Sequence, residues 1–401
     1  MYLTHLSLSN FRNFMRLDTP VPQGTLVVVG DNAQGKTSLL EAIYYLATFT
    51  SFQAGQHREL ISFLAPQENL VVGRIVAEYR RGEKNHRLEV RLIQEAQKFN
   101  GSRLRREVLL DGAKKKISGL VGHFNAVLFL PRMMSIIDGA PTERRRYLDL
   151  AISQTNPHYT ASLSAYNKAL GQRNALLRTL HERGGDPEQL SYWDEQIIQT
   201  GAYIIRSRIQ AIAELEEQAA IIHSELTRGA ERLRLAYRPA YDPHREPKNQ
   251  LALQFDTPID RSKFSQEEIA TGFHEALKAA QRAEIARGQT TLGPHRDDIQ
   301  FLANGIDLGI YGSRGQIRTA LLSLKIAEIN WMKTKTGFWP VLLLDEVLAE
   351  LDALRRADLI AHLTEIKQAL LTTTDLDLFA PEFVQAATTW HVRSGRLHTD
   401  H

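Results

Sequence analysis

An eight-residue run near the amino terminus has the residue types and spacing of a phosphate-binding loop. It consists of Gly30, Asp31, Asn32, Ala33, Gln34, Gly35, Lys36 and Thr37, and Ser38 follows it. Glycines let a backbone wrap closely around an anion, and N–H groups at the start of a helix attract phosphate. Lys36 would neutralise phosphate charge, and the Thr37 hydroxyl would bind Mg²⁺. The run therefore predicts a site for ATP or GTP.

A second motif supplies the carboxylates that such a site needs. The apolar run Val341–Leu344 ends in Asp345 and Glu346. We expect Asp345 to orient Mg²⁺ and Glu346 to act as the general base that polarises the attacking water. Alone, such a run is common in buried strands, but together with the phosphate loop it predicts hydrolysis of a nucleoside triphosphate.

The elements around both motifs fit this interpretation. An apolar strand at Leu26–Val29 precedes the loop, and a helix from Lys36 to about Tyr45 follows it. Alternation of apolar and polar residues predicts further strands at Tyr2–Leu8, Val71–Glu78, Leu88–Leu92 and Leu109–Gly112, the last running into a turn. Later strands are expected at Ile299–Phe301, Val341–Leu344 and Ala369–Thr374, with a long helix from about Gly315 to Met332.

The middle of the chain has helical periodicity. Apolar residues recur at helical spacing from about Asn156 to Arg234, with a break at Gly184–Pro187, which predicts an antiparallel helical hairpin about 40 to 55 Å long at 1.5 Å per residue. A proline-containing loop at Pro239–Pro258 leads to a helix at Gln266–Arg287. Since Lys36 and Asp345 must meet in one nucleotide site, the helical segment is an excursion from a single head. We predict a head formed by residues 1–150 and 288–401 and a helical arm at 151–287.

Composition narrows the class of protein. The 401 residues are 43% hydrophobic and 24% charged, as in ordinary globular proteins, and contain no cysteine, which excludes disulfides and thiolate metal sites. The amino terminus lacks the order of a signal peptide, and no stretch of about 18 uncharged apolar residues occurs, so we expect a cytoplasmic protein with no membrane partner.

Basic residues cluster in one short segment, although the net charge is only +3. The cluster consists of Arg103, Arg105, Arg106, Lys114, Lys115 and Lys116, and Arg144–Arg146 follow later. A solvated charged face and a surface for nucleic-acid phosphates are about equally compatible with this pattern alone.

Three further segments resemble the RecF family of bacterial DNA-repair proteins, a branch of the SMC-like ABC ATPases. The segment Tyr311–Arg318 is similar to the ABC signature in its S-R-G-Q form, Thr291–Asp298 to the family's G-P-H-R-D-D run, and Ala349–Asp352 to the loop after the Walker B strand. Leu8–Phe14, Val127–Pro131 and Gly139–Arg145 also resemble the family, so the likeness covers nearly the whole chain.

The resemblance implies an α/β fold: an ABC-type P-loop ATPase head built from both ends of the chain, with an inserted α-helical arm. It also implies an ATP-dependent homodimer, in which the signature residues Ser313, Arg314, Gly315 and Gln316 face the γ-phosphate held by the other subunit. Asp352 would lie across the same interface, and Arg12 would approach the nucleotide.

The resemblance further implies that the protein is a switch-like, DNA-dependent ATPase that acts in recombinational repair and replication-gap processing. It would bind double-stranded and gapped DNA through phosphate contacts, hydrolyse ATP slowly to reset the dimer, and help to load RecA with RecO and RecR. A motor or nuclease, a transport ATPase subunit, and a scaffold without turnover are the alternative classes. The arm and the G-P-H-R-D-D run disfavour the transporter.

The chain departs from the family pattern at two places. Arg132 and Met133 stand where an acidic pair is usual, and Gln53 and Ala54 follow Ser51–Phe52 where arginine and threonine are usual. His295 is expected to fix a loop rather than to do chemistry, and Asp297 and Asp298 to form caps and salt bridges.

Overall fold

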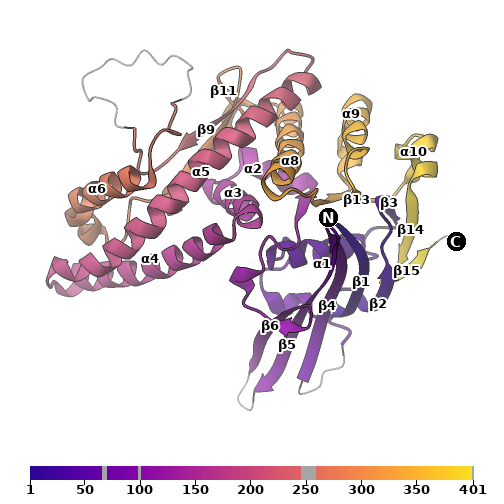
Figure 1. Ribbon diagram of the computed structural model, residues 1–401, viewed down its shortest axis with the longest axis horizontal. Helices are drawn as coiled ribbons and strands as arrows, with labels where there is room; N and C mark the ends of the chain where they lie inside the picture. Colours follow the sequence, from indigo (N-terminus) through magenta and orange to yellow (C-terminus); the bar gives the residue numbers. More distant parts are fainter. Residues whose placement is uncertain (66–69, 98–100, 245–258, 400–401) are drawn as a thin grey trace. The chain divides into compact units, whose positions relative to one another are not determined.

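The computed structural model describes residues 1–65, 70–97, 101–244 and 259–399. The chain divides into two compact units: unit 1 contains Met1–Met133 and Glu328–His401, and unit 2 contains Met134–Ala327 (Figure 1). These bounds differ from those predicted for head and arm, and residue 150 falls inside the helix α3, Pro141–Thr155. The predicted division into head and arm stays a prediction.

Unit 1 contains a six-stranded, mostly parallel sheet in the order β15-β14-β3-β13-β12-β8. Only the pair β14 and β15 is antiparallel. The strands are β3 Gly24–Val29, β8 Ala126–Phe129, β12 Val341–Asp345, β13 Gln368–Thr373, β14 Thr388–Arg393 and β15 Arg396–Thr399. Strands β8, β12 and β13 are buried along their whole length, as expected for a parallel sheet covered on both faces. This sheet brings the two ends of the chain together.

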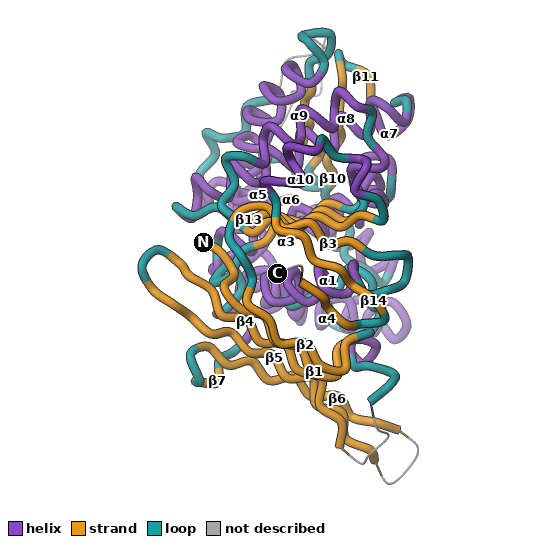
Figure 2. The backbone as a smooth tube through the Cα atoms, turned by 90° about the vertical axis from the view of Figure 1, so that its right-hand side faces the viewer, coloured by secondary structure: helices purple, strands orange, loops and turns teal. Residues whose placement is uncertain are grey.

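A second sheet in unit 1 is antiparallel, in the order β2-β1-β4-β5-β6-β7. Its strands are β1 Tyr2–Phe11, β2 Phe14–Pro20, β4 Leu70–Arg81, β5 Lys84–Gln97, β6 Gly101–Leu110 and β7 Ala113–Lys114. Helix α1, Lys36–Thr48, contacts β4 of this sheet and β8, β12 and β13 of the parallel sheet (Figure 2). The helix that follows the phosphate loop is therefore held between two sheets. Short helices α9, Ala353–Leu363, and α10, Pro381–Ala386, complete the unit.

Unit 2 is mostly helical. Helices α4, Pro157–Arg183, and α5, Ser191–Leu226, form the predicted antiparallel hairpin, and α6, Gln266–Arg287, packs on both (Figure 1). A small sheet has the order β11-β10-β9, with β9 Leu233–Arg238, β10 Asp298–Ala303 and β11 Ile306–Asp307. Short helices α2, Ser135–Asp138, and α7, Leu308–Tyr311, also belong to it, and α8, Arg314–Thr336, begins in it. Among the described residues, no helix has the length and apolar character needed to span a membrane.

One detail of the sequence prediction is wrong. The helical segment ends at Leu226 rather than Arg234, because Thr227 follows the last helical residue and Leu233 already begins β9. The predicted strand at Ile299–Phe301 is present within β10, which pairs with β9 and β11. Alternation of apolar residues indicates a strand but not its partner, which depends on contacts distant in the sequence. Part of the predicted loop Pro239–Pro258 lies outside the described residues.

Candidate nucleotide-binding site

The phosphate loop connects β3 to α1 and has glycines where a larger residue would not fit. The Gly30 N–H donates to the Thr373 carbonyl oxygen on the neighbouring strand at 3.3 Å, and a Cβ atom on Gly30 would lie 2.4 Å from the Val392 oxygen. Gly35 has φ +120°, a conformation that side chains disfavour. The backbone therefore wraps tightly at the amino terminus of α1, where N–H groups bind anions.

Lys36 lies inside this loop, and its side chain is 3% exposed. The ammonium group donates to the carbonyl oxygens of Gly30, at 2.6 Å, and Asp31, at 3.1 Å. It also lies 3.0 Å from Glu346 Oε1. The positive charge is thus held at the centre of the loop, close to the second motif.

Thr37 and Asp345 meet at the end of β12 and form an oxygen cluster. The Thr37 hydroxyl lies 3.1 and 2.9 Å from the two carboxylate oxygens of Asp345, and Thr372 Oγ1 donates to Asp345 Oδ1 at 2.6 Å. Burial raises the pKa of Asp345, and the neighbouring Glu346 carboxylate also raises it, whereas the two hydroxyl contacts lower it. A hydroxyl and a carboxylate are hard oxygen donors of the kind that hold Mg²⁺ together with substrate phosphates. These residues fit that ion.

Glu346 is placed differently from its neighbour. Its side chain is 39% exposed, and its backbone has the left-handed φ of 53°. The Glu346 N–H donates to Thr372, at 3.0 Å to the hydroxyl and 3.3 Å to the carbonyl oxygen. Thr372 therefore holds the Asp345 carboxylate and the Glu346 backbone, while the Asp345 side chain is buried and the Glu346 side chain is accessible to water.

Arg12 is held beside the loop by a residue that sequence reasoning missed. Its guanidinium donates to both carboxylate oxygens of Glu41 on α1, at 2.7 and 3.0 Å, and to the Glu59 carbonyl oxygen at 3.0 Å. The Glu41 side chain is fully buried and also accepts a short hydrogen bond from Ser51. Bidentate contacts of this kind fix both the position and the orientation of an arginine.

Asn13 and the carboxy-terminal hairpin also support the loop. Asn13 Nδ2 donates to the Ala33 carbonyl oxygen at 3.2 Å, and Asn13 Oδ1 accepts from Ser38 at 3.2 Å. Gln34 accepts from the backbone of Ser394, at 2.6 Å, and of Gly395, at 3.0 Å. No local motif marks Ser394, whereas Asn13 lies within the family-like segment Leu8–Phe14, next to Arg12.

The signature segment forms a capping box at the start of α8 in unit 2. Ser313 Oγ accepts from the Gln316 N–H at 3.2 Å, and Gln316 Oε1 accepts from the Ser313 N–H at 2.9 Å. Ser313 and Arg314 are exposed, and Gly315 and Gln316 are half-buried. Asp352, in unit 1, caps α9 by accepting from the Arg355 N–H at 3.0 Å, which lowers the pKa of Asp352. Each motif therefore begins a helix within its own unit.

The predicted basic cluster does not lie on one face of its sheet. Arg103 and Arg105 are exposed on one face of β6, and Arg105 and Lys114 both pair with Glu107, at 3.2 and 2.7 Å. Arg106 lies on the opposite face and donates to the Tyr45 hydroxyl and the Phe49 carbonyl oxygen, at 3.3 and 3.2 Å. Lys115 and Lys116 are exposed in the following loop. Arg106 is thus tied to α1, although it is exposed like the other members of the cluster.

The residues of the G-P-H-R-D-D run have structural roles in unit 2. Asp297 is buried and forms a salt bridge with Arg208 at 2.9 Å. The two carboxylate oxygens of Asp298 accept hydrogen bonds from two nitrogens of the Arg144 guanidinium, at 2.6 and 3.0 Å. Tyr166 lies 2.6 Å from His295 Nδ1, and burial lowers the pKa of His295 to about 4. The salt bridges expected for the two aspartates are confirmed, and His295 fixes a loop.

Comparison with known proteins identifies the family. Residues 2–391 match the family described as RecF/RecN/SMC N terminal domain. The chain is 41% identical, over 409 residues, to DNA replication and repair protein RecF of Chloroflexus aurantiacus, and the match covers 99% of each chain. The chain belongs to the RecF family.

Other RecF relatives and structures agree with this assignment. A RecF protein of an Exiguobacterium strain is 38% identical over 400 residues and is matched along all of both chains. A solved structure of the recombination mediator protein RecF-ATPrS in the RecFOR pathway has a TM-score of 0.83 and 29% identity, and covers 100% of this chain and 98% of that one. The corresponding RecF-ATP structure has a TM-score of 0.81 and 29% identity, covering 100% and 99%. An Smc head domain from Pyrococcus furiosus, at 16% identity and a TM-score of 0.52, shares the fold. The predicted ABC-type α/β fold is confirmed.

One of the two departures from the RecF pattern, Arg132, contacts Phe52, the residue before the other departure at Gln53. The Arg132 guanidinium donates to the Phe52 carbonyl oxygen and lies 5.5 Å from the centre of the Phe52 ring. A cation above an aromatic face is attracted by the ring. Arg132 therefore joins the segment after Pro131 to the segment after Ser51.

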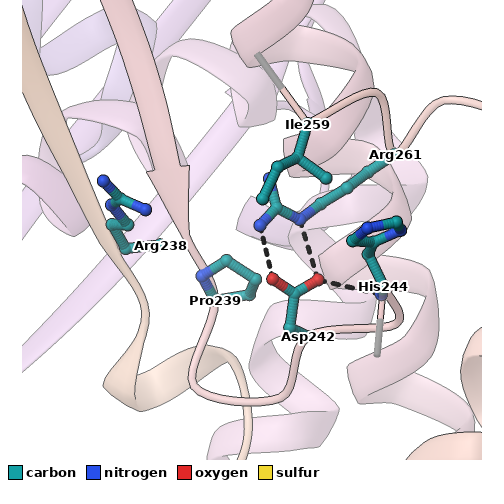
Figure 3. A pocket seen from close by; sticks show the side chains of 6 residues that line it. All are labelled: Arg238, Pro239, Asp242, His244, Ile259 and Arg261. Carbon is teal, nitrogen blue, oxygen red and sulfur yellow. Dashed lines mark hydrogen bonds and ion pairs between the residues drawn. The ribbon is translucent and has the colours of Figure 1, made fainter. Parts of the chain in front are cut away.

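A cavity of about 330 Å³ lies in unit 2 (Figure 3). It is lined by Arg238, Pro239, Asp242, His244, Ile259 and Arg261. Asp242 accepts from Arg261 Nε at 2.8 Å and from the His244 N–H at 3.0 Å. The carboxylate of Asp242 is therefore bonded to its neighbours in the wall, and the RecF motifs contribute nothing to this cavity.

Proposed function

We propose that this chain is an ATP-dependent DNA-binding protein of DNA replication and repair, and that slow ATP hydrolysis switches it between a monomer and a dimer. The observation that carries the proposal is the junction of the two motifs, where Thr37 meets Asp345 and Lys36 meets Glu346. The names of the relatives and the ATP-bound RecF structure support the choice of nucleotide and process.

Each residue of the junction has a distinct task in hydrolysis. The loop N–H groups and Lys36 would bind the β- and γ-phosphates. Thr37 and Asp345 would hold Mg²⁺, which supplies charge neutralisation when bound. Glu346, which is accessible to solvent, would accept a proton from the water whose oxygen forms the new bond to the γ-phosphorus. The bond between that phosphorus and the β–γ bridging oxygen breaks, and ADP carries away its electrons.

The switch would depend on the signature of a second copy. Ser313 and Arg314 are exposed at the start of a long helix, where N–H groups and a hydroxyl favour an anion. A γ-phosphate bound in one copy would contact Ser313–Gln316 of the other, with Asp352 at the same interface and Arg12 near the nucleotide. Because ATP would bind the dimer more tightly than the monomer, ATP would shift the population toward the dimer, and hydrolysis would reverse the shift.

DNA binding would use phosphate contacts without base readout. The exposed basic residues Arg103, Arg105, Lys114, Lys115 and Lys116 supply the charge. We propose double-stranded and gapped DNA as ligands, stimulation of ATP hydrolysis by DNA, and a cytoplasmic role with RecO and RecR in loading RecA. The RecFOR pathway named for the similar structure supports the choice of these partners.

The experiment is light scattering with and without ATP and Mg²⁺, on the wild type and on Lys36→Met. ATP should double the wild-type mass and leave the variant monomeric, because the variant lacks the charge that holds the phosphates. Gapped duplex added in a second series should bind the ATP form. A wild-type mass that ignores ATP would remove the dimer switch from the proposal.

A further inference from the structure

A chain of hydrogen bonds links the signature to the end of the long helix α5. Gln316 Nε2 donates to Glu231 Oε1 at 2.8 Å. The other oxygen of Glu231 lies 3.1 Å from Nε2 of His223, whose Nδ1 lies 3.1 Å from Ser323 Oγ on α8. All of these residues belong to unit 2. Glu231 therefore sits between the last turn of α5 and the first turn of α8.

The position of Glu231 is fixed from both sides. Its N–H donates to Thr227 Oγ1 at 3.3 Å, and Thr227 Oγ1 lies 2.7 Å from the His223 carbonyl oxygen. On the other side, Asn304 accepts from the Arg232 N–H at 2.9 Å and donates to the Ala230 carbonyl oxygen at 3.1 Å. The turn after α5 is thus hydrogen-bonded to α5 itself and to the β10–β11 turn. These bonds fix the backbone that carries the Glu231 side chain.

The chemistry of this contact determines how Gln316 is oriented. An amide group has one end that donates and one end that accepts, and a carboxylate only accepts. Glu231 therefore selects the amide nitrogen of Gln316, and the amide oxygen must face the N–H of Ser313. The Ser313 hydroxyl oxygen accepts from the Gln316 N–H, so the hydroxyl hydrogen of Ser313 points away from Gln316. Because Ser313 is exposed, this hydroxyl can donate a hydrogen bond to a ligand at the surface.

We propose that Glu231 is a positioning residue for the signature. By fixing the Gln316 amide, Glu231 holds the Ser313 hydroxyl in position to contact the phosphate bound by a second copy. The hydrogen bond between Glu231 and His223 links this position to the end of α5. The role of Ser313 in this inference rests on the function proposed above. The orientation of Gln316 by Glu231 does not rest on it.

The test compares Glu231→Ala and Glu231→Gln with Glu216→Ala as a matched control. Glu216 also joins α5 to β9, accepting from Arg234 at 2.7 Å and from the Leu235 N–H at 3.1 Å, and it is 21% exposed against 20% for Glu231. Neither of these partners of Glu216 belongs to the signature. In Glu231→Gln, the amide oxygen of the new side chain can still accept from Gln316, so that variant tests rescue.

Two readouts separate the inference from the proposed function. Without nucleotide, amide hydrogen exchange at Ser313 and Gln316 should speed up by about tenfold in Glu231→Ala, as expected for losing a hydrogen bond to a charged group. With ATP in the hydrolysis-deficient Glu346→Gln background, the protein concentration for half-dimerisation should rise by about tenfold. ATP binding by the monomer should stay within about twofold of the background value, because the hydrogen bonds of Glu231 described above involve no residue of the phosphate loop. Glu231→Gln should retain most of both properties, and Glu216→Ala should change neither.

Unchanged exchange at Ser313 and Gln316 in Glu231→Ala would overturn the inference. Equal losses in Glu231→Ala and Glu216→Ala would also overturn it, since they would show a general loss of stability. If the parent protein fails to dimerise with ATP, the proposed switch is wrong, and the exchange measurement still decides whether Glu231 positions Gln316.

Discussion

The ammonium group of Lys36 lies 3.0 Å from a carboxylate oxygen of Glu346. One partner is buried in the phosphate loop, and the other is accessible to water. The charge that would bind the γ-phosphate therefore also attracts the carboxylate that would activate water. A phosphate bound at Lys36 competes for the same ammonium group, so binding of ATP should release the Glu346 carboxylate from this ion pair.

Replacing Glu346 with glutamine should separate binding from hydrolysis. The amide keeps the size of the side chain but cannot act as a base, so steady-state phosphate release should fall by about 100- to 10,000-fold. The ATP-bound dimer should persist, as measured by light scattering over time. Glu365→Gln, at an exposed position after α9, is the control and should behave as the wild type. Turnover that survives in Glu346→Gln would assign the base to another residue.

Replacing Asp345 with asparagine should stabilise the protein while it abolishes Mg²⁺-dependent turnover. Burial raises the pKa of Asp345, so the folded protein binds the proton more tightly than the unfolded chain. This group therefore opposes folding at neutral pH, and the opposition disappears as pH falls below its ordinary pKa. A neutral amide should remove it, and we expect the Tm without nucleotide to rise by about 1–3 °C.

Calorimetry in EDTA gives the Tm of the Asp345→Asn protein, and phosphate release with Mg²⁺ gives its activity. Asp377→Asn, in an exposed turn outside the oxygen cluster, is the control. Asp358→Asn is less suitable because Asp358 lies within α9. A lower Tm in Asp345→Asn would show that the hydrogen bonds from Thr37 and Thr372 outweigh the burial of the charge.

Neutralising Lys114, Lys115 and Lys116 with glutamine should weaken DNA binding in a salt-dependent way. Each phosphate contact contributes about 0.9 to the slope of log K against log salt for duplex DNA, so the slope should fall by about 3 if all three bind phosphate. Fluorescence anisotropy over a salt series measures it. Lys168, Arg178 and Arg183, exposed on α4, give a control of equal charge change. Equal effects of the two triple variants would indicate only a general electrostatic attraction.

His295 should make the stability of unit 2 depend on pH. Burial lowers the pKa of His295 from 6.5 to about 4, so between these values the unfolded chain binds more protons. Above pH 6.5, the contribution of His295 to the free energy of unfolding should not change with pH. As pH falls from 6.5 to 4, this contribution should decrease by up to about 3 kcal/mol. Urea denaturation of the wild type and His295→Gln should reveal the difference, with exposed His181→Gln as the control. Parallel pH profiles for wild type and His295→Gln would contradict the assignment.

The sequence predicts best what local chemistry dictates. The glycines and Lys36 predict a strand-loop-helix junction, and the end of the apolar run at Asp345 predicts a carboxylate beside it; the structure contains both. The long helix expected after Ser313 is also present, because Ser313 and Gln316 have the spacing of a capping box.

Features that depend on distant partners are harder to predict. Glu41 looks like any polar residue of a helix, and its importance depends on Arg12, which comes from another part of the chain. The basic cluster is compact in sequence, but alternation along β6 sends Arg106 to the face opposite Arg105. In the same way, alternation identifies β10 but cannot indicate that β9 is its neighbour.

The strand order of the parallel sheet has a consequence for synthesis on the ribosome. The phosphate-loop strand β3 lies between β13 and β14, both of which are translated near the end of the chain. At ordinary elongation rates, β3 must wait on the order of half a minute for these neighbours. Unit 2 is a continuous segment and emerges earlier. A nascent chain that stalls before β13 therefore carries a phosphate-loop sequence that has no sheet to complete it, and it should be unable to retain nucleotide.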